Sequence, residues 1–184
     1  TKSGSKGIYL SRLDLKTGEL SEAELAAEIG ACGFLAIHPN KKFLYSVGEL
    51  KIPSDKPAGG VNAFAIDPKT GKLTFLNQRS SEGRGPAHLS VDHIGRCVMV
   101  ANYAGGSVAA LPINADGSLG QAASLIQHTG ASVHPTRQTA PHAHVIKVSP
   151  DNRFAFSADL GLDKVLIYKL DASKALLTPN DPSF

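Results

Sequence analysis

Two histidines, His142 and His144, lie two residues apart in the segment Pro141-His-Ala-His. On a β-strand this spacing places both side chains on the same face. Two imidazoles on one face could bind a metal ion, or one could take a proton from water near neutral pH. Because no third ligand lies beside them in the sequence, we expect acid–base chemistry with no metal and no cofactor. The alternative is that one histidine bonds a neighbouring strand and the other lines a solvated loop.

Three more candidates, Glu49, Asn102 and Asp159, each end an apolar segment. Glu49 could give or accept a proton, so it joins the two histidines as a candidate catalytic residue. Asn102 could polarise a carbonyl oxygen of a substrate. Asp159 is a candidate for substrate binding as well, although aspartate in such a turn more often accepts hydrogen bonds from backbone amides.

Arg137 precedes the histidine pair and could bind a phosphate or carboxylate through two parallel hydrogen bonds. His88, in Gly85-Pro-Ala-His, stands at the comparable place one repeat earlier and is a further candidate for substrate binding. The remaining histidines fall in expected turns or loops, and we assign them no role. They are His38, His93, His128 and His134.

The elements that must position these residues are repeated. Three stretches, 34–45, 88–99 and 145–156, each read as an apolar strand, a tight polar turn and a second apolar strand, recurring about every 55 residues. Each continues into a third strand and a weaker fourth. Four-stranded units repeated at such a period are typical of β-propeller blades, so we expect an all-β propeller.

A polar residue recurs after the third strand of every copy, followed by a glycine-type turn. Such residues accept local backbone hydrogen bonds and should build the fold rather than the site. They are Asp14, Asp67, Asn114 and Asp171. The segment 21–29 disagrees locally, because its serine and acidic residues resemble a helix start. Its place in the repeat predicts the outer strand of a blade, and we favour the repeat.

The repeats divide one propeller region, residues 1–184, into units of about 1–30 (partial), 31–83, 84–130 and 131–184. About three and a half blades cannot close a ring, and an open stack leaves strand edges exposed. We therefore expect the rest of the ring to come from residues outside this sequence or from another chain.

Composition narrows the function classes. Hydrophobic residues make up 42% of the chain, and the net charge of +3 is scattered without a basic cluster, which does not favour a nucleic-acid partner. No apolar run is long enough to span a bilayer and no signal-peptide pattern is present, so we expect no membrane partner and a cytoplasmic location. Cys32 and Cys97 lie in apolar contexts and are interpreted as buried thiols rather than a disulfide.

Several motifs together resemble the propeller-type lactonase family. They are Gly85-Pro-Ala-His-Leu-Ser-Val-Asp-His-Ile-Gly-Arg, Val100-Ala-Asn-Tyr-Ala-Gly-Gly-Ser-Val, Pro141-His-Ala-His and Ser157-Ala-Asp-Leu-Gly-Leu-Asp-Lys-Val. That family includes seven-bladed 6-phosphogluconolactonases and fungal carboxymuconate-cyclising enzymes. The resemblance covers essentially the whole chain and implies a seven-bladed ring, of which the chain is a little more than the first half.

The resemblance implies hydrolysis of a sugar lactone, most simply 6-phosphogluconolactone to 6-phosphogluconate in the pentose phosphate route. It places the active-site histidine in the Pro-His-Ala-His motif, as His142 or His144, with a glutamate and arginines supplied by later blades. Two alternatives stay open. One is a muconate-type cyclase that uses the same histidine, and the other is a non-catalytic propeller that binds other proteins.

Overall fold

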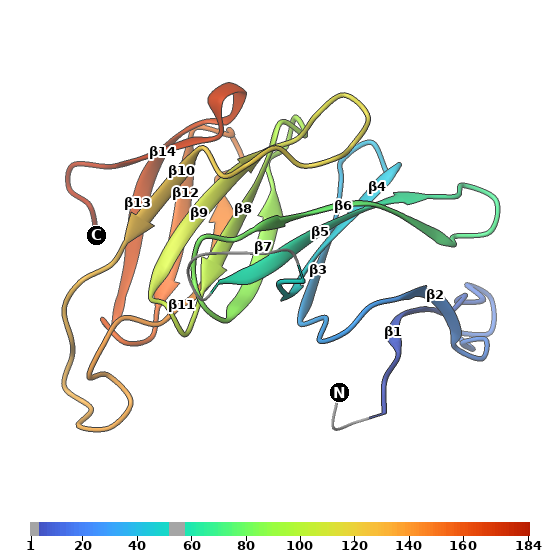
Figure 1. Ribbon diagram of the computed structural model, residues 1–184, viewed down its shortest axis with the longest axis horizontal. Helices are drawn as coiled ribbons and strands as arrows, with labels where there is room; N and C mark the ends of the chain where they lie inside the picture. Colours follow the sequence, from blue (N-terminus) through green and yellow to red (C-terminus); the bar gives the residue numbers. More distant parts are fainter. Residues whose placement is uncertain (1–3, 52–57) are drawn as a thin grey trace.

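The regular structure is almost entirely β-strand, as expected (Figure 1). The structure, a computed structural model, describes residues 4–51 and 58–184. Three four-stranded antiparallel sheets lie side by side, and a two-stranded sheet precedes them. The fold is that of a β-propeller with four-stranded blades.

Each sheet is a simple meander in which consecutive strands pair. The N-terminal pair is β1 (Gly7–Leu10) and β2 (Glu24–Glu28). The first full sheet holds β3 (Phe34–Ile37), β4 (Phe43–Glu49), β5 (Gly59–Ile66) and β6 (Leu73–Ser80). The second holds β7 (Pro86–Val91), β8 (Cys97–Asn102), β9 (Ser107–Pro112) and β10 (Ser124–Gln127). The third holds β11 (Ala143–Val148), β12 (Phe154–Asp159), β13 (Lys164–Asp171) and β14 (Leu176–Pro179), with a short 3-10 turn η1 (Ala172–Lys174) before β14.

The ambiguous segment 21–29 contains strand β2 (Glu24–Glu28) and no helix, so the prediction from the repeat is confirmed over the local helical pattern. Within it, β2 pairs antiparallel with β1, where Leu25 lies opposite Tyr9 and Ala27 opposite Ile8. Ala26 points inward and is buried. The pairing and this burial outweigh a helix propensity that differs between residues by only a few tenths of a kcal/mol.

The recurring polar residue builds the turn after the third strand, as predicted. Oδ1 of Asp14 and Oδ1 of Asp67 each accept hydrogen bonds from the backbone N–H groups two and three residues further on. Asp171 does the same at the start of η1, where its Oδ1 accepts from the backbone of Ser173 at 3.1 Å. Asn114 closes its turn with the backbone instead, because its carbonyl accepts from the fourth residue of the turn.

The sheets converge at their first strands. β7 packs against both β3 and β11, whereas the outermost strands of neighbouring sheets touch less closely. This arrangement turns the three innermost strands toward a common axis, which is how blades surround the channel of a propeller.

Each gap between neighbouring sheets has its own hydrophobic core. β8 shows why, since successive side chains of a strand point to opposite faces. Cys97, Met99 and Ala101 belong to the core shared with the third sheet, while Val98 and Val100 belong to the core shared with the first. All five are fully buried. Strand β8 is therefore apolar on both faces.

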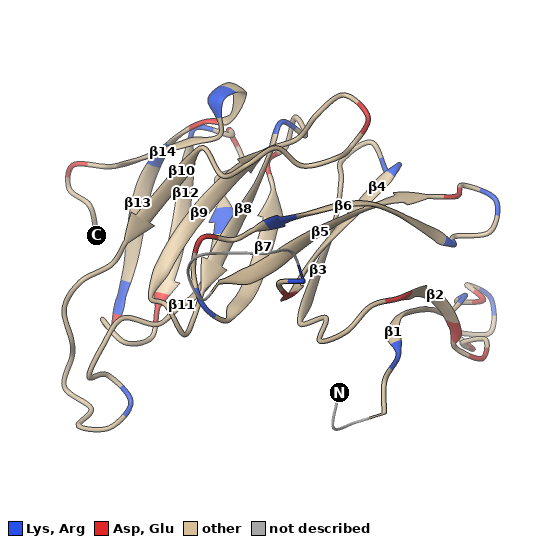
Figure 2. Ribbon diagram, in the orientation of Figure 1, with Lys and Arg blue, Asp and Glu red and all other residues tan. Residues whose placement is uncertain are grey.

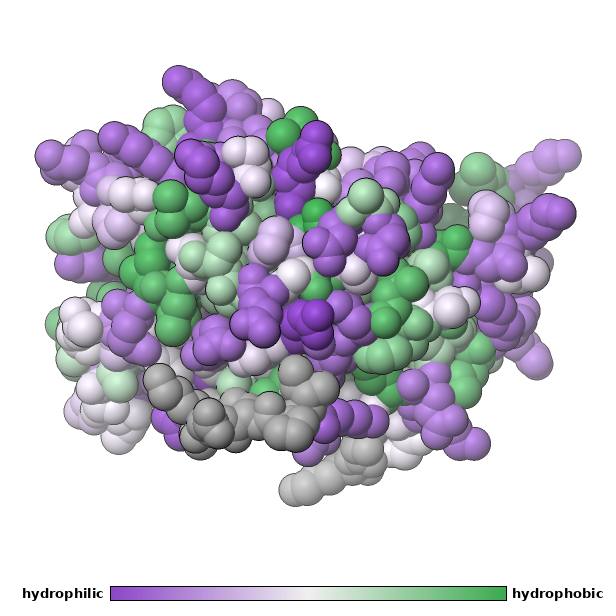
Figure 3. All heavy atoms as spheres, turned by 45° about the horizontal axis from the view of Figure 1, so that its top comes forward, coloured by the Kyte–Doolittle hydropathy of each residue, from purple (hydrophilic) through white to green (hydrophobic). Residues whose placement is uncertain are grey.

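Charged residues are spread over the described part of the chain. Lysine, arginine, aspartate and glutamate occur in most of its turns (Figure 2). On the face shown in Figure 3, apolar side chains form separate patches divided by polar ones. Both cysteines are free thiols, as expected, and Cys97 is buried as expected, whereas Cys32 is only partly buried. In the described part of the chain, no helix is long and apolar enough to cross a membrane.

Candidate active site

The candidate site lies where the long connection between β10 and β11 meets the turns that follow β8 and β12. This connection projects beyond the ends of the strands and returns to β11 (Figure 1). Its last residue, His142, contacts Tyr103 of the β8–β9 turn and Asp159 at the end of β12. Two neighbouring sheets thus hold one histidine between them.

His142 is anchored through its backbone and its ring. Its N–H donates to Oδ1 of Asp159 at 2.7 Å, and its carbonyl accepts from the N–H of Leu160 at 3.0 Å. Ring atom Nδ1 lies 3.0 Å from the carbonyl oxygen of Tyr103, and the imidazole stacks on the tyrosine ring with centroids 4.7 Å apart and planes at 17°. Both the position and the plane of the imidazole are therefore set by neighbouring groups.

The partner of Nδ1 decides which tautomer a neutral His142 adopts. A backbone carbonyl oxygen can only accept, so Nδ1 of His142 must carry the proton in this hydrogen bond. Nε2 then holds the lone pair. A half-buried imidazole with a fixed plane and an unprotonated Nε2 is suited to take a proton from water.

His144 contacts the same tyrosine in a different way. Its ring meets Tyr103 edge to face, at 5.5 Å and 86°, and its side chain is exposed. The register of β11 shifts between Ala143 and Val145, and His142 lies before the strand begins. The two histidines are therefore brought together by Tyr103 and an irregular strand end, not by the regular alternation that their spacing suggests.

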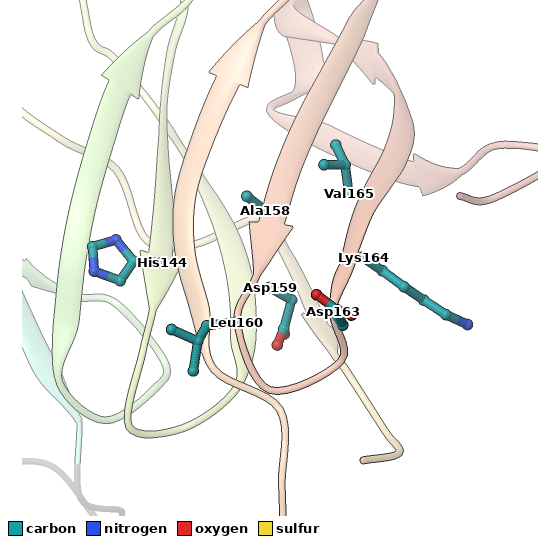
Figure 4. Close-up of a pocket in the computed structure, with 7 residues that line it drawn as sticks. All are labelled: His144, Ala158, Asp159, Leu160, Asp163, Lys164 and Val165. Atoms are coloured by element: carbon teal, nitrogen blue, oxygen red, sulfur yellow. The ribbon is translucent and has the colours of Figure 1, made fainter. Parts of the chain in front are cut away.

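His144 also lines an open cleft of about 340 Å³ in the third sheet, beside the end of β12 and the start of β13 (Figure 4). Leu160 and Asp163 from the β12–β13 turn and Lys164 at the start of β13 line the same cleft. The lysine side chain extends away from His144, and the imidazole faces the turn across the strand ends (Figure 4). The exposed histidine therefore shares one open cleft with the β12–β13 turn.

The three residues that end second strands do occupy equivalent places, at the ends of β4, β8 and β12. Glu49 is exposed. Asn102 is fully buried, and its Nδ2 donates to the carbonyl of Ser81 at 3.0 Å and to Oγ of Ser107 at 3.2 Å. Glu49 thus faces solvent while Asn102 ties two backbone segments together.

Asp159 is the most heavily bonded of the three. Its Oδ1 accepts from the N–H groups of His142, Gly161 and Leu162, at 2.7, 2.9 and 3.1 Å. Burial alone would raise the pKa of Asp159, but hydrogen bonds from His128 and from the backbone outweigh it and hold this pKa below its ordinary value. The carboxylate is therefore ionised at neutral pH and holds the turn on which His142 rests.

The two candidates for anion and substrate binding differ in exposure. Arg137 lies on the long connection with an exposed side chain. His88 is only 5% exposed, and its ring packs against Phe34 with centroids 4.2 Å apart. Burial, and then the nearby charges of Lys147 and His144, lower the pKa of His88 to about 4, so His88 is neutral at pH 7.

His128, to which the sequence assigned no role, does lie in a loop, as expected, but it is not solvated there. Its side chain is 1% exposed and its Nδ1 lies 2.6 Å from Oδ2 of Asp159. Its Nε2 lies 2.7 Å from Oη of Tyr168. The repeat did indicate that His128 is unusual, because the previous copy has Ser81 at this position. A residue type that differs from the other copies is a candidate for a role beyond the fold. The two residues make matching backbone bonds, His128 to Gly106 and Ser81 to Gly59.

The segment before β11 packs against two glycines, Gly106 and Gly161, where a larger residue would not fit. A Cβ on Gly161 would collide with the carbonyl oxygen of Ala140, and a Cβ on Gly106 would lie 2.6 Å from that of Pro141. Gly106 also has φ of +63°, which favours glycine. Because these glycines belong to turns of two different sheets, Pro141 and His142 can pack tightly between them.

The described residues, 4–51 and 58–184, contain no group of three His, Cys, Asp or Glu side chains placed to hold a metal ion.

Known proteins resemble this chain along its full length. The family model described as "Lactonase, 7-bladed beta-propeller" matches residues 1–184. A protein of Bacillus subtilis named 6-phosphogluconolactonase is 41% identical over 170 residues, which are 92% of this chain and 47% of that protein.

Solved structures agree. The periplasmic gluconolactonase of Pseudomonas aeruginosa superposes with a TM-score of 0.88 at 31% identity, over 100% of this chain and 52% of that one. A putative 6-phosphogluconolactonase of Bacteroides fragilis gives a TM-score of 0.86 at 31% identity, over 98% and 50%. The chain spans about half the length of these relatives.

Proposed function

Since the chain belongs to the seven-bladed β-propeller lactonase family, we propose that it supplies the general base of an enzyme that hydrolyses a sugar lactone. The proposed substrate is 6-phosphogluconolactone and the product 6-phosphogluconate, a step of the pentose phosphate route. The names of the relatives support this substrate class, since they include 6-phosphogluconolactonases and a gluconolactonase.

The observation that carries the proposal is the hydrogen bond between Nδ1 of His142 and the carbonyl of Tyr103. This hydrogen bond assigns the free lone pair to Nε2. The stacking of the imidazole on the Tyr103 ring fixes the plane of the imidazole. His144 has neither constraint from Tyr103, since it meets the ring edge-on and is exposed. Between the two histidines, His142 is therefore the proposed base.

The reaction proceeds by attack of water on the lactone carbonyl. Nε2 of His142 takes one proton as the water oxygen bonds to the carbonyl carbon, which forms a tetrahedral oxyanion. Collapse of this intermediate breaks the bond between the carbon and the ring oxygen. The imidazolium then returns its proton to the departing alkoxide, and the product is the open-chain hydroxy acid.

The other candidates take two kinds of role in this proposal. His144, Glu49 and Arg137 have exposed side chains and could meet the substrate directly, with Arg137 toward its phosphate. Asn102, His88 and Asp159 are buried and would support substrate binding through the strands and turns that they hold. Removing one of them would disturb the shape of the site rather than a single contact.

The remaining blades would come from further residues of the polypeptide or from another chain, and would supply the other groups around the substrate. We place the enzyme in the cytoplasm, where a sugar phosphate is available and where free thiols such as Cys32 and Cys97 stay reduced. Because the Pseudomonas relative is periplasmic, cell fractionation is the direct check.

The test compares His142→Asn with His144→Asn in the complete gene product. Asparagine can keep the hydrogen bond to the Tyr103 carbonyl while removing the basic nitrogen, so folding should be preserved. We expect hydrolysis of 6-phosphogluconolactone to fall about 100-fold or more in His142→Asn, as for loss of a general base. His144→Asn should lose much less. Equal, wild-type rates in both variants would contradict the proposal, and a larger loss in His144→Asn would reverse the two roles.

A further inference from the structure

A chain of three buried polar side chains runs from the middle of the third sheet to the candidate site. It joins Tyr168 on β13, His128 after β10 and Asp159 at the end of β12, with separations of 2.7 and 2.6 Å. The side chains of His128 and Asp159 are 1% and 0% exposed, and Tyr168 is 2% exposed. Buried polar groups are costly unless they are bonded, so each member depends on its neighbours.

Asp159 is the end of this chain that reaches the site. One carboxylate oxygen accepts from His128, and the other accepts from the N–H of His142. The residue after Asp159, Leu160, donates its own N–H to the carbonyl of His142. The backbone N–H and the backbone carbonyl of His142 are therefore both hydrogen-bonded to the turn that Asp159 holds together.

His128 and Tyr168 determine how Asp159 is held. An ionised carboxylate without solvent needs several donors, and Nδ1–H of His128 is the only side-chain donor to Asp159 among the described residues. Tyr168 in turn fixes the ring of His128 through Nε2. If either contact were lost, Asp159 would gain freedom to rotate or to take up water.

The second sheet shows what a blade looks like without this chain. There Asn102 stands in place of Asp159 and bonds to Ser81 and Ser107 through Nδ2. Its Oδ1 is buried and has no hydrogen-bond partner in the described part of the chain. Ser81 is the counterpart of His128, and Asn102 bonds to its backbone carbonyl, not to its side chain. Among these two sheets, a row of three bonded side chains that ends at the backbone of the residue before the first strand is therefore found in the third sheet alone.

We infer that His128 and Tyr168 are positioning residues for His142, acting through Asp159 on the backbone of the catalytic base. The inference rests on the proposed function, in which His142 takes the proton from water. It assigns a role in turnover to two residues that cannot touch the substrate.

The test uses Tyr168→Phe in the complete gene product, because this change removes one oxygen atom and keeps the ring. A base displaced by a fraction of an ångström loses rate, and we expect kcat to fall about tenfold with KM nearly unchanged. The backbone amide of His142 should exchange its hydrogen faster than in the wild type. His128→Asn keeps a donor at the position of Nδ1, so it should retain more activity than His128→Ala.

Tyr45→Phe is the matched control. Tyr45 is also fully buried, and its hydroxyl donates to the carbonyl of Gly117 at 3.0 Å, in the turn at the opposite end of the sheets. We expect this variant to lose thermal stability like Tyr168→Phe, and to keep the wild-type kcat and the wild-type exchange rate at His142.

Two outcomes overturn the inference. One is equal kcat in Tyr168→Phe and Tyr45→Phe with unchanged exchange at His142. The other is an equal loss in His128→Asn and His128→Ala with no change in exchange. If the wild-type protein shows no lactone hydrolysis, the proposed function fails. The hydrogen-exchange rate at His142 in Tyr168→Phe still decides whether Tyr168, His128 and Asp159 fix the backbone of His142.

Discussion

The carbonyl oxygen of Tyr103 lies 3.0 Å from Nδ1 of His142, and the two rings stack 4.7 Å apart. One residue thus sets both the tautomer and the plane of the imidazole. Tyr103 follows β8 in the second sheet, whereas His142 leads into β11 in the third. The orientation of the proposed base therefore depends on how two blades pack against each other.

Tyr103→Ala should separate the two contributions of that residue. The substitution removes the stacked ring and keeps the backbone carbonyl, so His142 keeps its tautomer but loses the wall that fixes its plane. We expect kcat/KM for 6-phosphogluconolactone to fall about tenfold, as for a mispositioned base. Tyr103→Phe, which keeps the ring, should stay close to the wild type. An unchanged rate in Tyr103→Ala would show that stacking does not matter.

Gly161→Ala should damage both stability and activity. The new methyl group would collide with the carbonyl of Ala140, and the segment that carries His142 would have to move. We expect a loss of about 1–3 kcal/mol in the free energy of unfolding, typical of an overpacked site, measured by urea denaturation. A Cβ on Gly30 meets no atom within 4 Å. Gly30→Ala is therefore the control and should change neither quantity appreciably.

Leu111→Ala should test the core between the first two sheets. Leu111 on β9 is fully buried, so its truncation removes packed methyl groups and leaves a cavity. The expected loss in the free energy of unfolding is about 2–5 kcal/mol. Leu15 is 90% exposed, and Leu15→Ala should stay within about 0.5 kcal/mol of the wild type. Similar values for the two variants would contradict the observed packing.

His88 should make stability depend on pH. The unfolded chain binds a proton at His88 with a pKa of about 6.5, whereas burial holds the pKa of His88 near 4 in the folded state. The unfolded state therefore binds more protons between these values. The stabilisation is complete above about pH 6.5 and is lost progressively as the pH falls toward 4.

The measurement is the difference in melting temperature between pH 7 and about pH 5, a range above the titration of most carboxylates. His88→Asn has no titratable group and should shrink this difference. His93 is exposed, and His93→Asn is the matched control substitution at the surface. A full pH effect in His88→Asn would assign the acid sensitivity to other residues.

The repeat made the fold predictable from the sequence. Three full copies and a partial one, with one polar position after the third strand, were enough to place a strand in segment 21–29, although its own residues resemble a helix. Local propensity failed there because the partner strand, β1, lies more than ten residues away and its influence is tertiary.

The candidate site was less predictable. The motif around His142 and His144 is local, so it could be found, and the equivalence of Glu49, Asn102 and Asp159 followed from the repeat. The role of His128 could not be inferred from its neighbours, because its partners Asp159 and Tyr168 lie 31 and 40 residues further along the chain. The stacking of His142 on Tyr103, across 39 residues, was hidden for the same reason.

Strand β8 takes part in two separate cores, one on each face. Unfolding of the second sheet would therefore expose apolar surface on both of its neighbours. No sheet can unfold alone without a loss of packing in the next sheet. Such nearest-neighbour coupling makes a row of units unfold together, as in a one-dimensional cooperative array. The amides of β8 should then exchange their hydrogens only when the whole row opens, which makes this strand the slowest reporter of global unfolding.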